Sequence, residues 1–329
     1  MKISLLVYEG AISSSISSVT DIFGGVNGFL RMQGRPEAFE LELVCRDVNN
    51  THLYLPAGDL KKVALKDVVS TDLIIVPAFQ GDADAALTQN ADLIAWLKEM
   101  SAKGTEIASL CFGSYFLAEA GLLGDKPCTS HWAAMQDMRQ RYPQLNIQPD
   151  MVITDQDGIY TSGGAFLSLN LVLYLIEKFC GKEVTVWASK MFSIDIDKVN
   201  QAHFAIFQSQ RRHEDKVILK AQDIIEKNFQ QQLSIDQIAE QSNMSTRNFI
   251  RRFKSATNNT PIEYLQRVKI EAAKKALERN DQDINGLMYD AGYNDVKTFR
   301  MIFKRITGLT PQEYRKKYSR TITLADRLN

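Results

Sequence analysis

Histidine and cysteine are scarce in this sequence, and their spacing fits no metal site. Among 329 residues there are four of each. The cysteines form no Cys-x-x-Cys pair and no Cys/His cluster at zinc spacing; they are Cys45, Cys111, Cys128 and Cys180. We therefore expect no structural metal, no disulfide framework and no bound cofactor, which suits the reducing cytoplasm.

Long apolar runs and targeting signals are also missing. No run approaches the roughly 20 residues that cross a bilayer. The opening MKISLLVYEG lacks a small-residue cleavage site and predicts a β-strand rather than a signal peptide. We therefore expect a globular protein that does not contact a membrane, for which 45% hydrophobic and 24% charged residues are ordinary.

Net charge is zero, but the two signs are unevenly distributed along the chain. Residues 1–209 carry 16 Lys+Arg against 24 Asp+Glu, a net of −8. Residues 210–320 carry 22 Lys+Arg against 14 Asp+Glu, a net of +8. The length and the split predict two domains, with a basic C-terminal module that meets a polyanion, most commonly nucleic acid. Simple attraction between the two halves would explain the same numbers.

The acidic half alternates between apolar runs and amphipathic patterns. The runs predict strands at 3–8, 41–45, 72–78, 106–111 and 151–155. The amphipathic patterns predict helices at 91–100, 114–123 and 168–181, the last preceded by a glycine-rich turn at 161–166. Strands alternating with helices predict an α/β domain, with a mostly parallel sheet covered by helices on both faces.

From Lys216 onward every pattern is helical, and one stretch suits a helix-turn-helix. Ser234 can cap a short first helix. A tight turn follows, in which Asn243 can take the left-handed conformation. Ser245 then caps a second helix. The apolar face of that second helix is expected to consist of Phe249, Ile250 and Phe253.

The same pattern returns about fifty residues later. Asp283 can cap the first helix of this copy, and Gly292 lies in its turn. The inner face of its second helix is expected to consist of Phe299, Ile302 and Phe303. Both copies end in Thr-Pro, two residues and a tyrosine, in TPIEY and TPQEY. A repeat of this detail indicates two copies of one structural unit.

Residues 216–320 resemble the DNA-binding domain of the AraC/XylS family of bacterial transcription regulators. The motifs A-G-Y-x-D (291–295) and F-x-x-x-F-K-x-x-x-G-x-T-P (299–311) match, while Asn243 and Lys269 replace the family's usual glycine and arginine. The resemblance implies an all-α domain whose two recognition helices enter successive major grooves. Basic and amide side chains suit phosphates and base edges. The residues expected to contact DNA are Arg247, Asn248, Arg251, Lys254, Val296, Lys297, Arg300 and Lys304.

In the acidic half, a predicted strand runs into Cys-Phe-Gly at 111–113 and a helix follows at once. Such a turn lifts one side chain above the edge of the sheet, as in a nucleophile elbow. A helix N-terminus at this place would favour a thiolate. His131 comes twenty residues later and is a candidate to face Cys111.

Residues 1–195 resemble the DJ-1/PfpI branch of the glutamine-amidotransferase-like superfamily, which implies a flavodoxin-like fold. The matching segments are VPAFQG (76–81), the Cys-x-Gly elbow with AEAGLL (118–123), TSHW (129–132) and the TSGG turn. The acidic residue that members usually place beside the cysteine would fall near Ser15, where this sequence has none. Phe112 stands where the protease-like members often carry histidine, and PAF replaces PGG. We therefore expect no catalytic residues; an enzyme would have to use Cys111 and His131.

The leading hypothesis is a transcription regulator that senses a small metabolite without turning it over. The residues expected around its ligand are Phe79, Gly81, Cys111, Phe112 and His131. The alternative is a cysteine hydrolase or a glyoxalase/deglycase that uses Cys111 and is fused to a DNA-binding module. A third hypothesis, reversible oxidation of Cys111 in a redox sensor, lacks a resolving cysteine nearby.

Together these resemblances divide the chain and imply its partners. The expected parts are a DJ-1/PfpI-like sensing domain at 1–195, a linker at 196–215, an AraC-type double helix-turn-helix domain at 216–320 and a tail at 321–329. The implied partners are double-stranded promoter or operator DNA, a small-molecule effector, a second copy of the chain and, for an activator, RNA polymerase. We expect the protein in the bacterial cytoplasm.

Overall fold

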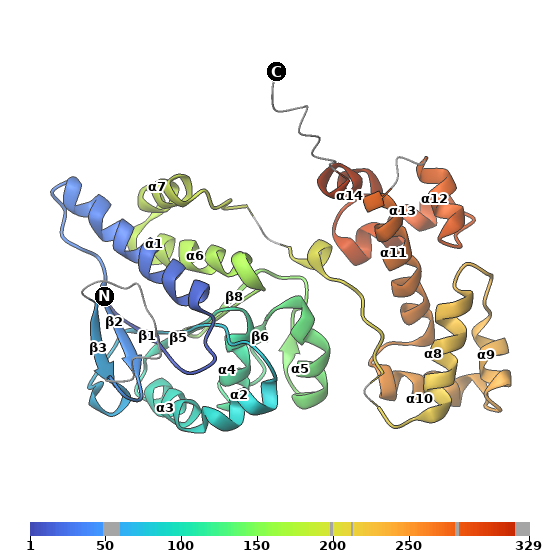
Figure 1. The fold of residues 1–329 in the computed structure, drawn as a ribbon, viewed down its shortest axis with the longest axis horizontal. Coiled ribbons are helices and arrows are strands. Elements are labelled where there is room, and N and C mark those ends of the chain that lie inside the picture. The colour runs from blue at the N-terminus through green and yellow to red at the C-terminus, as the bar shows by residue number, and fades with distance from the viewer. Residues whose placement is uncertain (49–59, 198–199, 212, 280–282, 320–329) are drawn as a thin grey trace, which may run out of the picture. The chain divides into compact units, whose positions relative to one another are not determined.

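The computed structural model describes residues 1–48, 60–197, 200–211, 213–279 and 283–319 (Figure 1). The chain divides into one unit at Met1–Gln201 and a second that begins at Ala202. The predicted tail at 321–329 lies outside the described residues.

The apolar runs of the first unit form one seven-stranded sheet in the order β3-β2-β1-β4-β5-β9-β8 among the described residues. Neighbouring strands pair in parallel, except that β8 is antiparallel to β9. The strands are β1 Lys2–Leu6, β2 Glu40–Cys45, β3 Lys61–Ala64, β4 Leu73–Val76, β5 Glu106–Ser109, β8 Ile153–Gln156 and β9 Ile159–Ser162. Two short strands, β6 Pro127–Cys128 and β7 Asn146–Ile147, pair separately.

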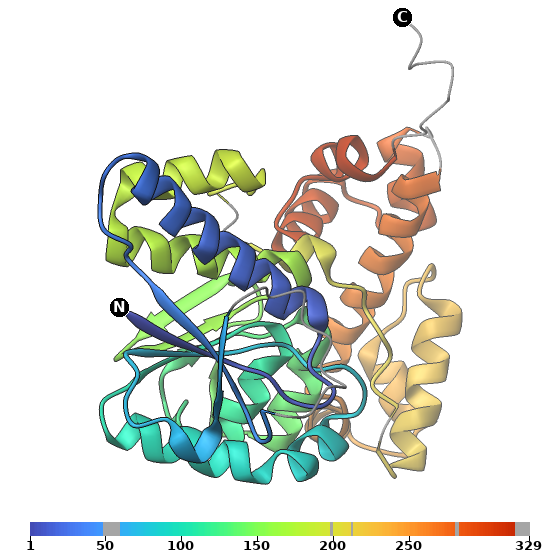
Figure 2. The same cartoon turned by 60° about the vertical axis from the view of Figure 1, so that its left-hand side comes forward.

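Helices cover both faces of this sheet (Figure 2), which confirms the predicted α/β fold. Because side chains alternate along a strand, Leu5 of β1 enters one core and Leu6 the other. The first core is closed by α1 Ser13–Met32, α6 Leu169–Cys180 and α7 Lys182–Phe192. The second is closed by α2 Ala83–Gln89, α3 Ala91–Ala102, α4 Ser114–Glu119 and α5 Met135–Arg141.

Strand β9 differs from the sequence-based prediction. We expected a glycine-rich turn over 161–166, but Thr161 and Ser162 end β9, and the turn begins at Gly163. The prediction was wrong because polar residues were assigned to a turn, whereas the polar side chains of β9 form hydrogen bonds inside the protein. The Thr161 hydroxyl oxygen accepts a hydrogen bond from the Thr129 backbone N–H at 2.7 Å. A buried strand with bonded hydroxyls does not stand out as an apolar run.

Helices are the only regular secondary structure in the described residues of the second unit, which has a core at each end of one long helix (Figure 1). Its helices are α8 Lys216–Asn228, α9 Ile235–Gln241, α10 Thr246–Thr257, α11 Pro261–Arg279, α12 Ile284–Asp290, α13 Val296–Thr307 and α14 Pro311–Tyr318. The long helix α11 contributes Tyr264 to the core with α8, α9 and α10. It contributes Ile270 and Leu277 to the core with α12, α13 and α14. The helix therefore holds the two cores together.

Part of the predicted linker packs within this second unit. The short 3₁₀ turn η5 Ala202–Phe204 places His203 Nε2 2.7 Å from the Lys317 ammonium. The Phe207 backbone N–H donates to Glu271 of α11 at 3.1 Å. These contacts tie the start of the unit to α11 and α14.

Candidate functional site

The first helix-turn-helix consists of α9, a tight turn and α10. Ser234 stands at the N-cap of α9, but its side chain makes no capping hydrogen bond, so that expected contact was wrong. The Ser234 backbone carbonyl accepts a hydrogen bond from the Ile238 backbone N–H, as in an ordinary turn of helix. Asn243 takes the predicted left-handed conformation with φ of 52°. Ser245 caps α10 as predicted, because its hydroxyl oxygen accepts from the Asn248 backbone N–H.

The second helix-turn-helix consists of α12, its turn and α13. The Asp283 carboxylate caps α12 by accepting from the Asn285 backbone N–H at 3.1 Å. Gly292 has a φ of 78°, as a left-handed turn requires. Asp295 caps α13 by accepting from the Thr298 backbone N–H at 2.7 Å. Hydrogen bonds from Thr298 hold the pKa of Asp295 below its usual value.

The two copies share one register, counted from the N-caps Ser245 and Asp295. The fourth and eighth residues after each cap are phenylalanines with no exposed surface: Phe249, Phe253, Phe299 and Phe303. The twelfth is a threonine, Thr257 or Thr307, whose hydroxyl donates to the carbonyl of the preceding phenylalanine at 2.8 Å. Outward-facing residues of α10 and α13 can therefore be compared position by position.

Most residues predicted to contact DNA lie on the side of each helix away from the phenylalanines. The exposed ones are Arg247, Asn248, Arg251, Lys254, Lys297, Arg300 and Lys304. Val296 is half-buried and packs against the core around α13. The Arg251 guanidinium donates to the Asn248 side-chain oxygen at 2.9 Å. Both helices thus present cations to solvent, as a surface that binds phosphates would.

One residue of α10 lies at the flank of the helix and not inside, where we had expected it. Ile250 was expected inside but is 36% exposed. It is turned about 100° from Phe249, and Phe249 and Phe253 already fill the core side.

Arg252 of α10 has a role that sequence reasoning missed. Its guanidinium pairs with Asp215 at 2.9 Å, and this carboxylate also caps α8. The pair anchors α10 to α8. The sequence signals only the cap, since Asp215 precedes α8 directly, and not the pair with Arg252.

Sequence reasoning also missed Met301 of α13. Its side chain is 63% exposed and stands six residues after the N-cap, the position that Arg251 occupies in α10. Aligning the two copies at their caps would have found it. Its apolar side chain differs from the basic and amide side chains expected to contact DNA.

In the first unit, the predicted elbow is confirmed. Strand β5 ends at Ser109, and Cys111 opens the 3₁₀ turn η2 Cys111–Gly113, directly followed by α4. Cys111 has a φ of 56°, a left-handed conformation that costs a non-glycine residue about 1–2 kcal/mol. Strain of this kind concentrates at functional sites.

The Cys111 thiol is buried and its backbone is well bonded. Only 4% of the residue is exposed, and burial raises the pKa of the thiol. The Ala165 backbone N–H donates to Sγ at 3.5 Å and partly opposes that rise. The Ser130 hydroxyl donates to the Cys111 carbonyl at 3.0 Å. The thiol is therefore held largely protonated at neutral pH.

His131 is part of an aromatic stack beside the elbow. Its ring lies 4.9 Å from the Phe112 ring at an interplanar angle of 12°, and the Phe79 ring lies 5.7 Å from Phe112. The His131 Nδ1 accepts from the Ala133 backbone N–H at 3.0 Å, which places the proton of the neutral ring on Nε2. Burial lowers the pKa of His131.

Other predicted groups near the cysteine do not complete a catalytic set. Gly81 is exposed. The Ser15 hydroxyl, near the position where the family places its acid, accepts from the Ala78 backbone N–H at 3.1 Å. Asp137 of α5 accepts from Tyr115 at 2.8 Å and from Arg141 at 2.7 Å.

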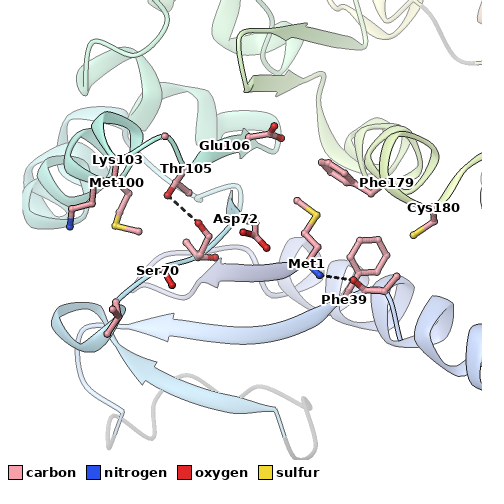
Figure 3. A pocket seen from close by; sticks show the side chains of 14 residues that line it. Met1, Phe39, Ser70, Asp72, Met100, Lys103, Thr105, Glu106, Phe179 and Cys180 are labelled. Carbon is pink, nitrogen blue, oxygen red and sulfur yellow. Dashed lines mark hydrogen bonds between the residues drawn. The ribbon is translucent and has the colours of Figure 1, made fainter. Parts of the chain in front are cut away.

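A hollow of about 730 Å³ lies at the other edge of the sheet (Figure 3). Asp72 precedes β4 and Glu106 begins β5, so their side chains line the hollow at the amino ends of the strands. Cys111 follows the carboxyl end of β5, the edge at which open α/β sheets bind ligands. The hollow is therefore separate from the predicted ligand residues.

Neither a metal-binding cluster nor a membrane-spanning helix occurs in the described part of the chain. No group of three or more His, Cys, Asp and Glu residues is arranged there to hold a metal ion. Among the same residues, no helix combines the length and apolar character needed to span a membrane.

Each half of the chain matches the model of a known protein family or domain. The model of the DJ-1/PfpI family matches residues 56–178, and the model of a helix-turn-helix domain matches residues 238–317. The match to the helix-turn-helix model begins within α9 and ends within α14. It therefore includes α10 and α13, the second helices of the two helix-turn-helix units.

Two curated relatives are named as helix-turn-helix transcriptional regulators. The HTH-type transcriptional regulator GbdR of Pseudomonas aeruginosa is 23% identical over 226 residues, which are 68% of this chain and 61% of GbdR, so the chain spans less than two thirds of that relative. The HTH-type transcriptional regulator CdhR of the same species is 24% identical over 68% of this chain and 66% of CdhR. A solved AraC family transcriptional regulator from Pseudomonas putida is similar with a TM-score of 0.48 and 18% identity, over 58% of this chain and 98% of that one. The first half of the chain thus matches the DJ-1/PfpI family model and the second half matches a helix-turn-helix model, and its curated relatives are named as helix-turn-helix transcriptional regulators.

Proposed function

We propose that this protein is a sequence-specific DNA-binding transcription regulator whose first domain senses a small metabolite. The observation that carries the proposal is the pair of capped helices α10 and α13, each with buried phenylalanines on one side and exposed cations on the other. The net charge of +8 over residues 210–320 supports it. Cations hold such a protein on the phosphates, while neighbouring side chains read the bases.

DNA binding by the full-length protein is expected to depend steeply on salt. If the two helices neutralise about six phosphates, affinity falls about 1000-fold between 50 and 200 mM salt. Fluorescence anisotropy on duplexes from the region upstream of the protein's own gene measures this. Lys297→Ala should reduce the slope of log affinity against log salt by about one, whereas Lys103→Ala, directly after α3 in the first unit, should leave it unchanged. Binding that does not respond to salt, or no binding at all, would contradict the proposal.

The first domain is proposed to bind its effector without turning it over. Cys111, Phe112 and His131 lie at the carboxyl edge of the sheet, which supports a ligand site there. A raised thiol pKa argues against a cysteine hydrolase or a glyoxalase/deglycase, which needs a thiolate. To regulate DNA binding, the effector must bind one arrangement of the protein more tightly than another.

Alkylation of Cys111 by iodoacetamide is expected to be slow in the native protein. Burial raises the thiol pKa, so at any given pH less thiolate is present than in a free cysteine, and access is restricted. Peptide mass spectrometry at pH 7.5 should show a rate at least about tenfold below that of the urea-unfolded chain. Rapid alkylation that levels off below pH 7 would instead indicate an activated nucleophile and support the enzyme alternative.

We also propose a homodimer in the cytoplasm, because joining two weak half-sites on DNA increases affinity without new contacts. RNA polymerase is a further proposed partner if the protein is an activator. The domain boundaries proposed from the sequence are 1–195, 196–215 and 216–320. Analytical ultracentrifugation with and without a duplex tests the dimer, and a thermal-shift screen of metabolites tests the effector.

A further inference from the structure

The outward face of α13 carries one large apolar side chain at its centre. Met301 is 63% exposed, whereas Phe299, Ile302 and Phe303 are at most 5% exposed. At about 100° per residue, Met301 lies about 200° round the helix from Phe299, on the side away from the core. Lys297 stands four residues before it and Lys304 three residues after it, both exposed. Met301 is therefore flanked by cations on the helix face proposed to meet DNA.

The equivalent position in α10 carries a different chemical group. Arg251 and Met301 both stand six residues after their N-caps, and the buried phenylalanine pairs fix this register. A guanidinium at this place can donate two hydrogen bonds to guanine O6 and N7. A thioether has no comparable donor. The two recognition helices thus differ in chemistry at the centre of the same face.

A single exposed apolar residue is ordinary on a protein surface. Its position is informative here, because a side chain at the centre of a recognition helix faces the edges of the base pairs. The apolar group that base pairs present in the major groove is the C5-methyl of thymine. We propose that Met301 packs against this methyl group in the part of the duplex bound by α13. The inference rests on the proposed DNA-binding function and assigns one base preference within it.

Deoxyuridine provides a direct test, because it differs from thymidine only by that methyl group. Bound duplexes are first selected from a randomised library with the full-length protein. Each thymine of a selected site is then replaced singly by deoxyuridine. At one thymine the replacement should weaken binding about fourfold, the effect of removing one buried methyl group from contact.

Three variants assign the effect to Met301. Met301→Ala should bind the thymine and deoxyuridine duplexes equally, because the contacting side chain is gone. Lys297→Ala should weaken binding to both duplexes alike and keep their ratio near four, since a phosphate contact carries no base preference. Met301→Arg should change the preferred base at that position to guanine. Since Met301 is exposed, folding of its variants is checked by an unchanged thermal melt.

The outcomes separate this inference from the function it rests on. If deoxyuridine has no effect at any thymine, or if Met301→Ala keeps the fourfold ratio, the inference is wrong while DNA binding stands. If the library yields no enriched duplex, both the inference and the proposed function are wrong.

Discussion

Gly292→Ala is expected to destabilise the second unit by about 3 kcal/mol or more and to abolish DNA binding. Gly292 has a φ of 78°, where an L side chain costs about 1–2 kcal/mol. An added Cβ would lie 2.7 Å from the Phe229 carbonyl oxygen and 2.9 Å from the Gln230 Cα. Both are backbone atoms at the end of α8, so the chain itself must move. Hydrogen exchange of α12 and α13 peptides and an anisotropy titration with a selected duplex measure the two effects.

Asn243 is the matched position in the first helix-turn-helix and supplies the control. It also lies left-handed, with φ of 52°, but carries a side chain. Asn243→Gly removes that strain while increasing the freedom of the unfolded chain, so stability should change by less than about 1 kcal/mol. DNA binding should persist. Slow exchange and normal binding in Gly292→Ala would mean that the turn does not approach α8 as closely as the structure shows.

The features that the sequence predicted correctly are those with local signals. Ser245 and Asp283 stand directly before their helices, and a cap acts within three residues. The buried phenylalanines of α10 and α13 follow from a helical period repeated twice. The elbow at Cys111 follows from a strand that runs directly into a helix.

The features that the sequence did not predict depend on contacts between distant residues. The strand position of Thr161 depends on Thr129, 32 residues away, which satisfies its hydroxyl. The anchor of α10 depends on Arg252 meeting Asp215 across 37 residues. The high thiol pKa of Cys111 arises from burial by the folded domain, although the helix N-terminus beside it favours the opposite direction. Composition and spacing do not contain these distances.

Met301 and Ile250 were missed for a different reason. Their apolar character predicts burial, and only the count from the N-cap places Met301 on the outer side of α13 and Ile250 at the flank of α10. Apolar residues are usually buried, but an apolar residue that contacts an apolar group of a binding partner is exposed in the free protein. The exceptions on a recognition helix are therefore the positions at which base specificity is to be sought.

Gly113→Ala is expected to destabilise the first unit by about 3 kcal/mol, the upper end of the usual cost of overpacking a core. Gly113 has a helical φ of −56°, so the effect does not arise from backbone strain at this residue. It arises because an added Cβ would lie 2.6 Å from the Val76 carbonyl oxygen and 2.8 Å from that of Pro77. These atoms end β4, next to the strand that delivers Cys111 to its elbow.

Tryptophan fluorescence during urea unfolding measures the loss in the first unit, because all three tryptophans of the chain lie there. Gly24→Ala is the matched control: Gly24 is exposed on α1 with no atom within 4 Å of an added Cβ, so alanine should stabilise by about 0.5–1 kcal/mol. A loss of stability in Gly113→Ala and a gain in Gly24→Ala would show that the close contact between Gly113 and the end of β4 determines the position of the elbow at Cys111. Equal stability of Gly113→Ala and the unchanged protein would rule out this close approach, and the position of Cys111 would then depend on its own hydrogen bonds to Ser130 and Ser162.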